Sequence, residues 1–180
     1  IDAQAHLIKL AGVDLTEIDG LQENSVLKIL SETGTNMEKW PTVKHFTSWL
    51  GLSPGTKISG GKVLSSKTKK CKNQAAVTFR LAAQTLGRSQ SALGAFLRRK
   101  KAHLGTAEAI TATAHKIARI FYTMLKTKKP YSDLGADYYE QRYQDRSLKK
   151  MALKAKALGY ELVKTILEPT MDGAHMNAIV

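Results

Sequence analysis

The sequence predicts a mainly α fold with one short β-hairpin, and three observations lead to this class. Apolar residues recur at helical spacing from Asn73 almost to the end of the chain. A single strand-like segment, residues 56–64, contains the turn Ser59-Gly60-Gly61. With 180 residues and 43% hydrophobic content, the chain can bury a core. We therefore expect a helical domain in which the hairpin carries the Ser-Gly-Gly turn.

The segment that opens this domain is a turn of the apolar-x-Gly-apolar kind. Residues 15–21 resemble the turn of a helix-hairpin-helix, a motif that binds DNA backbones, but Gln22 replaces the usual second glycine. The opening is thus a degenerate helix-hairpin-helix, and a plain turn between helices is the alternative. The helix that follows is expected from about Ser25 to the stop at Gly34.

A short helix is expected before the hairpin, and three helices are expected after it. Pro41 suits the first turn of the short helix, which ends at Gly51. The spacing then predicts helices that begin at Asn73, at Ser89 or Gln90, and at Thr106, because these residue types cap helix N-termini. After a join rich in tyrosine, a long charged helix runs to about residue 158.

The charge of the chain is strongly unbalanced. No Asp or Glu lies between Glu38 and Glu108, and the formal net charge is +13. A surface of one sign attracts polyanions, so we expect contact with DNA or RNA. The residues assigned to nucleic-acid binding are Lys57, Lys62, Lys67, Lys69, Lys70, Lys72, Arg80, Arg98, Arg99, Lys100 and Lys101.

Several functional classes find no support in the sequence. The lone Cys71 has no partner for a disulfide and no ligand spacing for zinc. The basic half offers no carboxylates for a metal site, so no metal or other cofactor is expected in this chain. A P-loop fails because Thr56 and Val63 occupy two of its required positions. No apolar run approaches the roughly 20 residues that span a bilayer, and we expect a cytoplasmic protein without membrane contact.

Ser59 is the remaining candidate for covalent chemistry. A serine attacks phosphate only when its proton is removed and the charge on the phosphoryl oxygens is offset. Lys57, Lys62 and Lys67 could offset that charge, whereas the sequence shows no neighbouring base. From the residues alone, a nucleophile and an ordinary turn serine both remain open.

Several blocks in a fixed order form a recognisable pattern. They are residues 46–55, the motif Ser59-Gly60-Gly61-Lys62, and residues 80–83, 91–96 and 112–118. This succession resembles the C-terminal domain of bacterial transposases of the insertion sequence 110 family, over residues 13–163.

The resemblance implies a function and a set of partners. It implies that Ser59, with Gly60 as its motif neighbour, attacks DNA and forms a covalent phosphoserine link. It also implies an N-terminal RuvC-like domain that binds Mg²⁺ through four acids, a guide RNA encoded by the mobile element, and action as a homo-oligomer. The fragment alone is then expected to bind nucleic acid without recombining DNA.

The resemblance also suggests how the chain is organised. We interpret residues 15–163 as the C-terminal transposase domain and residues 1–14 as the end of an upstream linker or coiled coil. Residues 164–180 are interpreted as a disordered tail that could be vector-derived. The alternative to a catalytic-serine domain is a basic module that only binds RNA or DNA.

Overall fold

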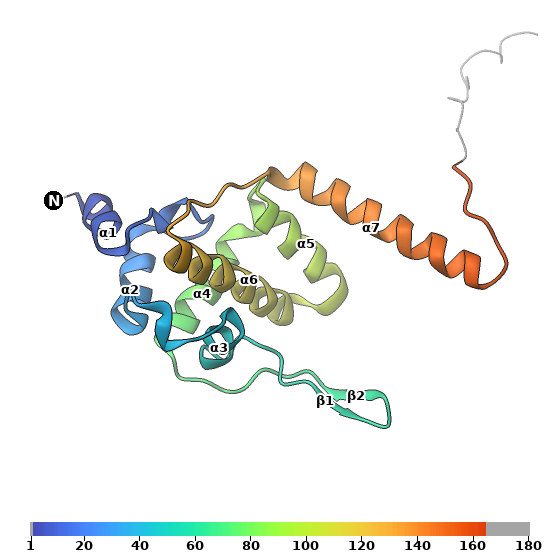
Figure 1. Cartoon of the computed structure of the whole chain (residues 1–180), viewed down its shortest axis with the longest axis horizontal. Helices are drawn as coiled ribbons and strands as arrows, with labels where there is room; N and C mark the ends of the chain where they lie inside the picture. The colour runs from blue at the N-terminus through green and yellow to red at the C-terminus, as the bar shows by residue number, and fades with distance from the viewer. Residues whose placement is uncertain (1, 165–180) are drawn as a thin grey trace, which may run out of the picture. The chain divides into compact units, whose positions relative to one another are not determined.

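The computed structural model describes residues 2–164. Within them the chain is mainly helical with one antiparallel hairpin, which confirms the predicted class (Figure 1). The α-helices are α1 Ala3–Ala11, α2 Glu23–Thr33, α3 Val43–Trp49, α4 Gln74–Thr85, α5 Ala92–Leu104, α6 Thr106–Thr127 and α7 Gly135–Ala157. The strands are β1 Lys57–Ser59 and β2 Lys62–Ser65, and three 3-10 turns are η1 Leu15–Glu17, η2 Met37–Lys39 and η3 Leu86–Arg88.

The chain divides into two compact units, residues 1–141 and residues 142–180. α7 begins in the first unit and continues into the second. Tyr138, Tyr139 and Tyr143 lie inside α7, not in a join before it, because this helix already begins at Gly135. The division into linker, domain and tail inferred from the sequence stays a prediction, and residues 165–180 of that tail lie outside the described part. Across residues 2–164, no helix has the length and apolarity needed to cross a membrane.

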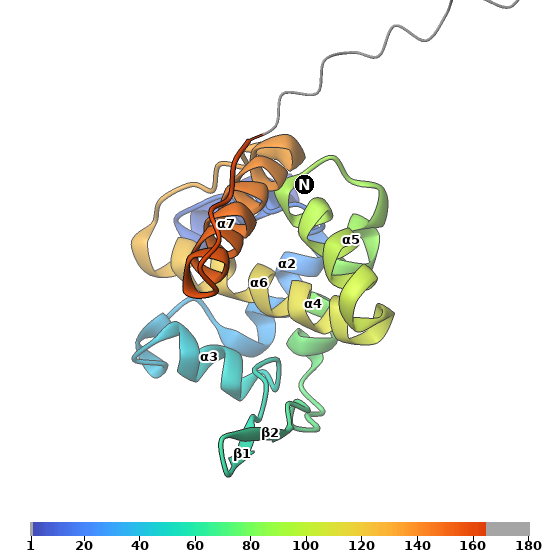
Figure 2. The ribbon, with the colours of Figure 1, turned by 90° about the vertical axis from the view of Figure 1, so that its right-hand side faces the viewer.

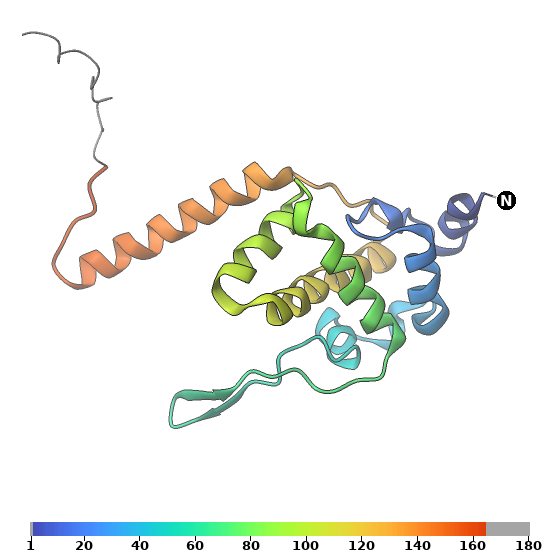
Figure 3. The ribbon, with the colours of Figure 1, turned by 180° about the vertical axis from the view of Figure 1, so that it is seen from behind.

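Helix α6 is the centre of the first unit. Its buried residues recur at spacings of three and four, and alanines among them let neighbouring helices approach closely. α3, α4 and α5 all pack against it (Figures 2 and 3). Phe79 of α4 meets Phe121 of α6 edge to face, with ring centroids 5.4 Å apart. On the α3 side, the Tyr122 hydroxyl donates a hydrogen bond of 2.7 Å to the Trp40 carbonyl.

Side-chain hydrogen bonds at the helix N-termini show which of several neighbouring residues is the N-cap. Asn73 caps α4 as predicted, because its side chain accepts from the Ala76 N–H. The predicted cap of α5 at Ser89 or Gln90 is wrong: Ser91 caps this helix, and the Ser89 backbone ends the 3-10 turn η3 instead. The third predicted cap, Thr106, lies one residue too late in the chain, since Gly105 occupies the N-cap of α6 and Thr106 is its first helical residue.

The opening turn is held by packing. Gly20 has φ +87°, and a Cβ on it would lie 2.7 Å from the Ala82 carbonyl oxygen of α4. The glycine therefore lets the turn sit directly on α4, a role that needs no nucleic acid. A single 3-10 turn, η1, precedes it. The comparison of this opening with a helix-hairpin-helix stays a prediction.

One long-range hydrogen bond ties α2 to the start of α4, and it generates a test of the fold. The Glu32 carboxylate accepts from the Ala75 N–H at 2.6 Å. Because it satisfies a free amide and adds negative charge at a helix N-terminus, Glu32→Ala should lower the free energy of unfolding by about 1 kcal/mol. Urea denaturation measures this change. Glu161→Ala, on an exposed carboxylate outside any helix, is the control and should change stability by less than about 0.5 kcal/mol. Equal stability of the two variants would contradict the assignment.

Candidate functional site

Ser59 lies in a long connection between α3 and α4, residues 51–72, which we call the hairpin arm. Two contacts close its base: Pro54 and Thr68 form an isolated bridge, and the Gly55 N–H donates to the Lys67 carbonyl at 3.0 Å. In Figures 1 and 3 the strands of the arm project away from α4, α5 and α6. The arm thus presents its tip to solvent while both of its ends are fixed on the helical unit.

Two contacts fix the arm to its neighbouring helices. Arg80 of α4 donates through Nη2 to the Gly51 carbonyl at 3.5 Å, and the Cys71 thiol lies 3.8 Å from the Trp49 carbonyl. Arg80 was assigned to nucleic-acid binding from the sequence. Its half-buried side chain here contacts the first residue of the arm, so it at least contributes to the arm's position.

The tip of the arm is a two-residue turn. Ser59 ends β1 and pairs with Lys62, the first residue of β2, so only Gly60 and Gly61 connect the strands. Their φ angles are +54° and +74°, the pair of positive values that a type I′ turn requires. Residues directly opposite in a hairpin share one face, so the Lys62 side chain extends from the same face as the Ser59 hydroxyl.

The faces of the hairpin carry apolar side chains exposed to solvent. Ile58 pairs with Val63, and the next pair joins Lys57 to Ser65, so Leu64 is the extra residue of a β-bulge. Ile58, Val63 and Leu64 are 64%, 62% and 68% exposed. An isolated two-stranded hairpin is only marginally stable, and these apolar side chains are left in contact with solvent.

The Ser59 hydroxyl lacks an activating group in this unit. Across residues 2–164 it makes no hydrogen bond, and no group of three or more His, Cys, Asp and Glu side chains could hold a metal ion. His115 lies on α6, outside the arm, and its pKa is lowered by burial and by the nearby Arg119. The geometry therefore exposes the Ser59 hydroxyl without supplying a group that would remove its proton.

The lysines of the hairpin arm are all exposed. The arm has no acidic residue, so its positive potential is not offset locally. These side chains lie on both strands and on the return segment to α4. They are Lys57, Lys62, Lys67, Lys69, Lys70 and Lys72.

The basic cluster at the end of α5 is divided between structural and exposed positions. Arg98 donates through Nη1 to the Ser89 carbonyl at 2.6 Å and to the Gly87 carbonyl at 3.4 Å, so it holds the turn before α5. The Arg99 guanidinium lies 5.6 Å from the centre of the Tyr139 ring. Lys101 is exposed.

The structure adds a cation that the sequence assignment left out. The Lys116 ammonium lies 4.6 Å from the centre of the Phe96 ring and 4.9 Å from that of Tyr139, and Lys100 lies 5.7 Å from the same Phe96 ring. Cations over aromatic faces are attracted to the ring quadrupole. The sequence feature that could have indicated Lys116 is a second stretch without Asp or Glu, residues 109–132.

A pocket of about 390 Å³ borders the opening turn and lies on a different part of the unit from the arm. Gly20 and Leu21 line it, and so does Asp19. A carboxylate in this position repels phosphate, which weakens the case for DNA contact at this turn.

The features described above are those of a basic helical domain with an exposed serine on a lysine-rich arm. A family model described as Transposase IS116/IS110/IS902 family matches residues 4–98, from α1 into α5, and includes the whole hairpin arm. The match covers more than half of the chain, so this chain belongs to that family of transposases. Comparisons with curated proteins and with solved structures returned no match.

The turn geometry predicts which residues the tip of the arm accepts. Gly60 has φ +54°, and a Cβ on it would have no atom within 4 Å, so a substitution tests backbone conformation without a clash. Gly60→Val should abolish the hairpin, because a β-branched residue at positive φ costs about 1–3 kcal/mol. Gly60→Asn should retain it, because asparagine tolerates this conformation.

Cross-strand nuclear Overhauser effects between Ile58 and Val63 measure the outcome. Gly87→Ala, at a position with open space and no positive φ, is the control for a general effect of adding a methyl group. Retention of the cross-strand signals in Gly60→Val would show that the turn does not determine the hairpin.

Proposed function

We propose that this domain supplies the serine nucleophile of a DNA transposase that cuts and rejoins DNA through a covalent phosphoserine. One observation carries the proposal: Ser59 is exposed beside the turn of an acid-free arm, directly opposite Lys62. Membership in the transposase family supports action on DNA. The hydroxyl is accessible to a bulky polymer, and the lysines provide charge that attracts the phosphodiester.

In the proposed step, Ser59 Oγ attacks the phosphorus of a DNA phosphodiester. A new O–P bond forms, the bond to one deoxyribose oxygen breaks, and the serine proton passes to a base while the leaving oxygen gains a proton. Lys62 and the neighbouring lysines stabilise charge on the non-bridging oxygens. Because the product is still a phosphodiester, a second deoxyribose hydroxyl can attack it, rejoin the strand and release Ser59.

The activating groups are proposed to come from another domain. The arm exposes Ile58, Val63 and Leu64 around the serine, a surface suited to such a domain. We propose that the other domain brings carboxylates with bound Mg²⁺, which would lower the pKa of the attacking hydroxyl or of a water acting as base. A homo-oligomer would allow that domain to belong to a second subunit.

RNA guidance fits the chemistry of the arm. Lysines bind phosphates without reading sequence, so target choice must come from elsewhere. We propose that an RNA encoded by the mobile element provides it through base pairing, with this domain holding backbones of RNA and DNA.

The nucleophile is tested by covalent trapping with full-length protein, its RNA and nicked DNA on a denaturing gel. Ser59→Ala should eliminate the protein–DNA adduct and change DNA affinity by less than about twofold, because a hydroxyl adds little to a polyelectrolyte contact. Ser66→Ala, on an exposed serine of the same arm, is the matched control and should retain the adduct.

An adduct that persists in Ser59→Ala would remove Ser59 as the nucleophile. The 180-residue chain alone is expected to bind DNA without exchanging strands, since its described residues contain no metal-binding group. Strand exchange by this chain would contradict the need for a second domain.

The second candidate is a module that binds nucleic acid without chemistry, and the six lysines of the arm favour it as much as they favour catalysis. Both candidates share an electrostatic prediction. If the domain engages about six phosphates, log affinity should fall with log salt at a slope near −5.

The arm itself is tested by Lys69→Ala combined with Lys70→Ala, which should reduce the magnitude of this slope by about 2. Fluorescence anisotropy across a salt series measures it, with Lys9→Ala on α1 as the control. A slope near zero for the unmodified chain would reject the electrostatic interface.

A further inference from the structure

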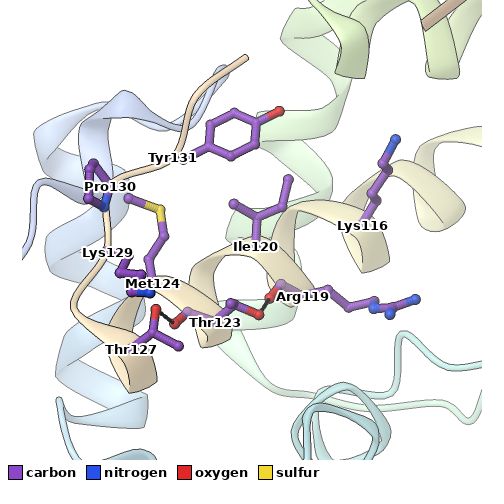
Figure 4. Close-up of a pocket in the computed structure, with 9 residues that line it drawn as sticks. All are labelled: Lys116, Arg119, Ile120, Thr123, Met124, Thr127, Lys129, Pro130 and Tyr131. Carbon is purple, nitrogen blue, oxygen red and sulfur yellow. Dashed lines mark hydrogen bonds between the residues drawn. The ribbon is translucent and has the colours of Figure 1, made fainter. Parts of the chain in front are cut away.

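A pocket of about 560 Å³ lies beside the C-terminal half of α6 and the segment that follows it (Figure 4). It is separate from the hairpin arm in sequence and in its lining residues. One wall is apolar and consists of Ile120, Met124, Pro130 and Tyr131. Its volume is in the range of about 300–1,000 Å³ typical of small-molecule sites.

The threonine hydroxyls on this stretch of α6 already donate hydrogen bonds within the helix, so these donors are not available to a ligand. The Thr123 hydroxyl donates to the Arg119 carbonyl at 2.9 Å, and the Thr127 hydroxyl donates to the Thr123 carbonyl at 2.8 Å. These bonds, drawn as dashed lines in Figure 4, satisfy the hydroxyl donors within the helix. The pocket therefore offers a ligand mainly an apolar surface along α6.

The charged residues that line the pocket are all cations: Lys116, Arg119 and Lys129. Arg119 and Lys129 are exposed. Two other lysines of the region, Lys126 and Lys128, instead donate to the carbonyls of Pro41 and Ala11 and so hold the fold together. The pocket thus combines an apolar wall with a positive rim.

Tyr131 is held in place at one end of the wall. Its N–H donates to the Glu17 carboxylate at 3.2 Å, and its hydroxyl lies 3.4 Å from the Asp133 carboxylate. Burial and the charge of Asp133 raise the pKa of Tyr131 to about 12, so its phenol carries no charge at physiological pH. The Asp133 carboxylate also accepts from the Ala92 N–H, the first backbone amide of α5.

An apolar wall with an aromatic ring and a positive rim matches a nucleotide, which has a flat apolar base and an anionic phosphate. We propose that this pocket holds the base of one unpaired nucleotide in a single-stranded nucleic acid, with Arg119 and Lys129 on the flanking phosphates. Bases stack on aromatic and apolar side chains with little sequence preference. The inference rests on the proposed function in that the polyanion is nucleic acid, but it needs no chemistry at Ser59.

The test measures the binding of short strands to the full 180-residue chain by fluorescence anisotropy. The probes are a single strand of about 12 nucleotides as DNA or as RNA, an abasic strand of that length, and a duplex. Tyr131→Leu, which keeps apolar bulk but removes the ring, should weaken binding of base-containing single strands by about 5- to 100-fold. Binding of the abasic strand and the duplex should change by less than about twofold, because they retain only backbone contacts.

Two further variants separate stacking from charge. Tyr131→Phe keeps the ring and should restore affinity for the single strands. Arg119→Ala should weaken the single strands and the abasic strand alike, since it removes a phosphate contact. The DNA and RNA arms show which sugar the site accepts, and preferential binding of either supports the proposal.

A second measurement does not depend on the stability of the variants. A strand carrying 5-iodouracil, cross-linked by light to the unmodified chain, should yield an adduct on the peptide that contains Tyr131. Cross-links confined to other peptides would overturn the proposal. The proposal would also be overturned if Tyr131→Leu lost equal affinity for base-containing and abasic strands. A third contrary outcome is that polyglutamate displaces both strands equally well from the unmodified chain and from Tyr131→Leu.

The outcomes for this pocket and for the serine are distinguishable. If the trapped Ser59 adduct forms normally while binding shows no dependence on bases at Tyr131, only the pocket proposal fails. If base-dependent binding at Tyr131 is found but no adduct forms at Ser59, the catalytic proposal fails and the binding site stands.

Discussion

The packing of α3 and α4 on a single helix, α6, is the constraint on which the rest of the first unit depends. Phe79 packs on Phe121, and Phe46 packs on Tyr122 one residue further along α6. The hairpin arm begins where α3 ends and returns where α4 begins, so these contacts also fix both of its ends. A rigid base allows the tip of a marginally stable hairpin to occupy a defined region of space.

The arm combines many exposed cations with a serine that has no activating neighbour among the described residues. It contains lysines in abundance and a serine beside an open turn, yet this unit offers that serine no hydrogen-bond partner within residues 2–164. A serine hydroxyl without a neighbouring base is a weak nucleophile toward phosphate. In a protein that cuts DNA, such an arrangement would keep chemistry dependent on assembly with the groups that complete the site.

The cations of the first unit serve different purposes according to their surroundings. Arg98, Lys126 and Lys128 hold backbone carbonyls, which makes them part of the structure. The lysines of the arm are exposed, and Arg119 and Lys129 lie at the rim of an apolar pocket. Net charge alone therefore overstates the number of cations available to a polyanion, because some of them are engaged by backbone carbonyls.

The sequence by itself determined the mainly α class, the hairpin and most helix positions, because apolar spacing, glycine turns and capping residues act over a few neighbours. It also indicated Ser59 through the motif Ser59-Gly60-Gly61-Lys62. Only the tertiary structure decided that Ser91 caps α5, that Gly20 packs on Ala82, and that Lys116 lies over two aromatic rings. The last two of these contacts join residues distant in the chain, so local patterns could not specify them. The cap of α5 depends on where the turn η3 ends among several adjacent polar residues, because Ser89 ends that turn and Ser91 is then left to cap the helix.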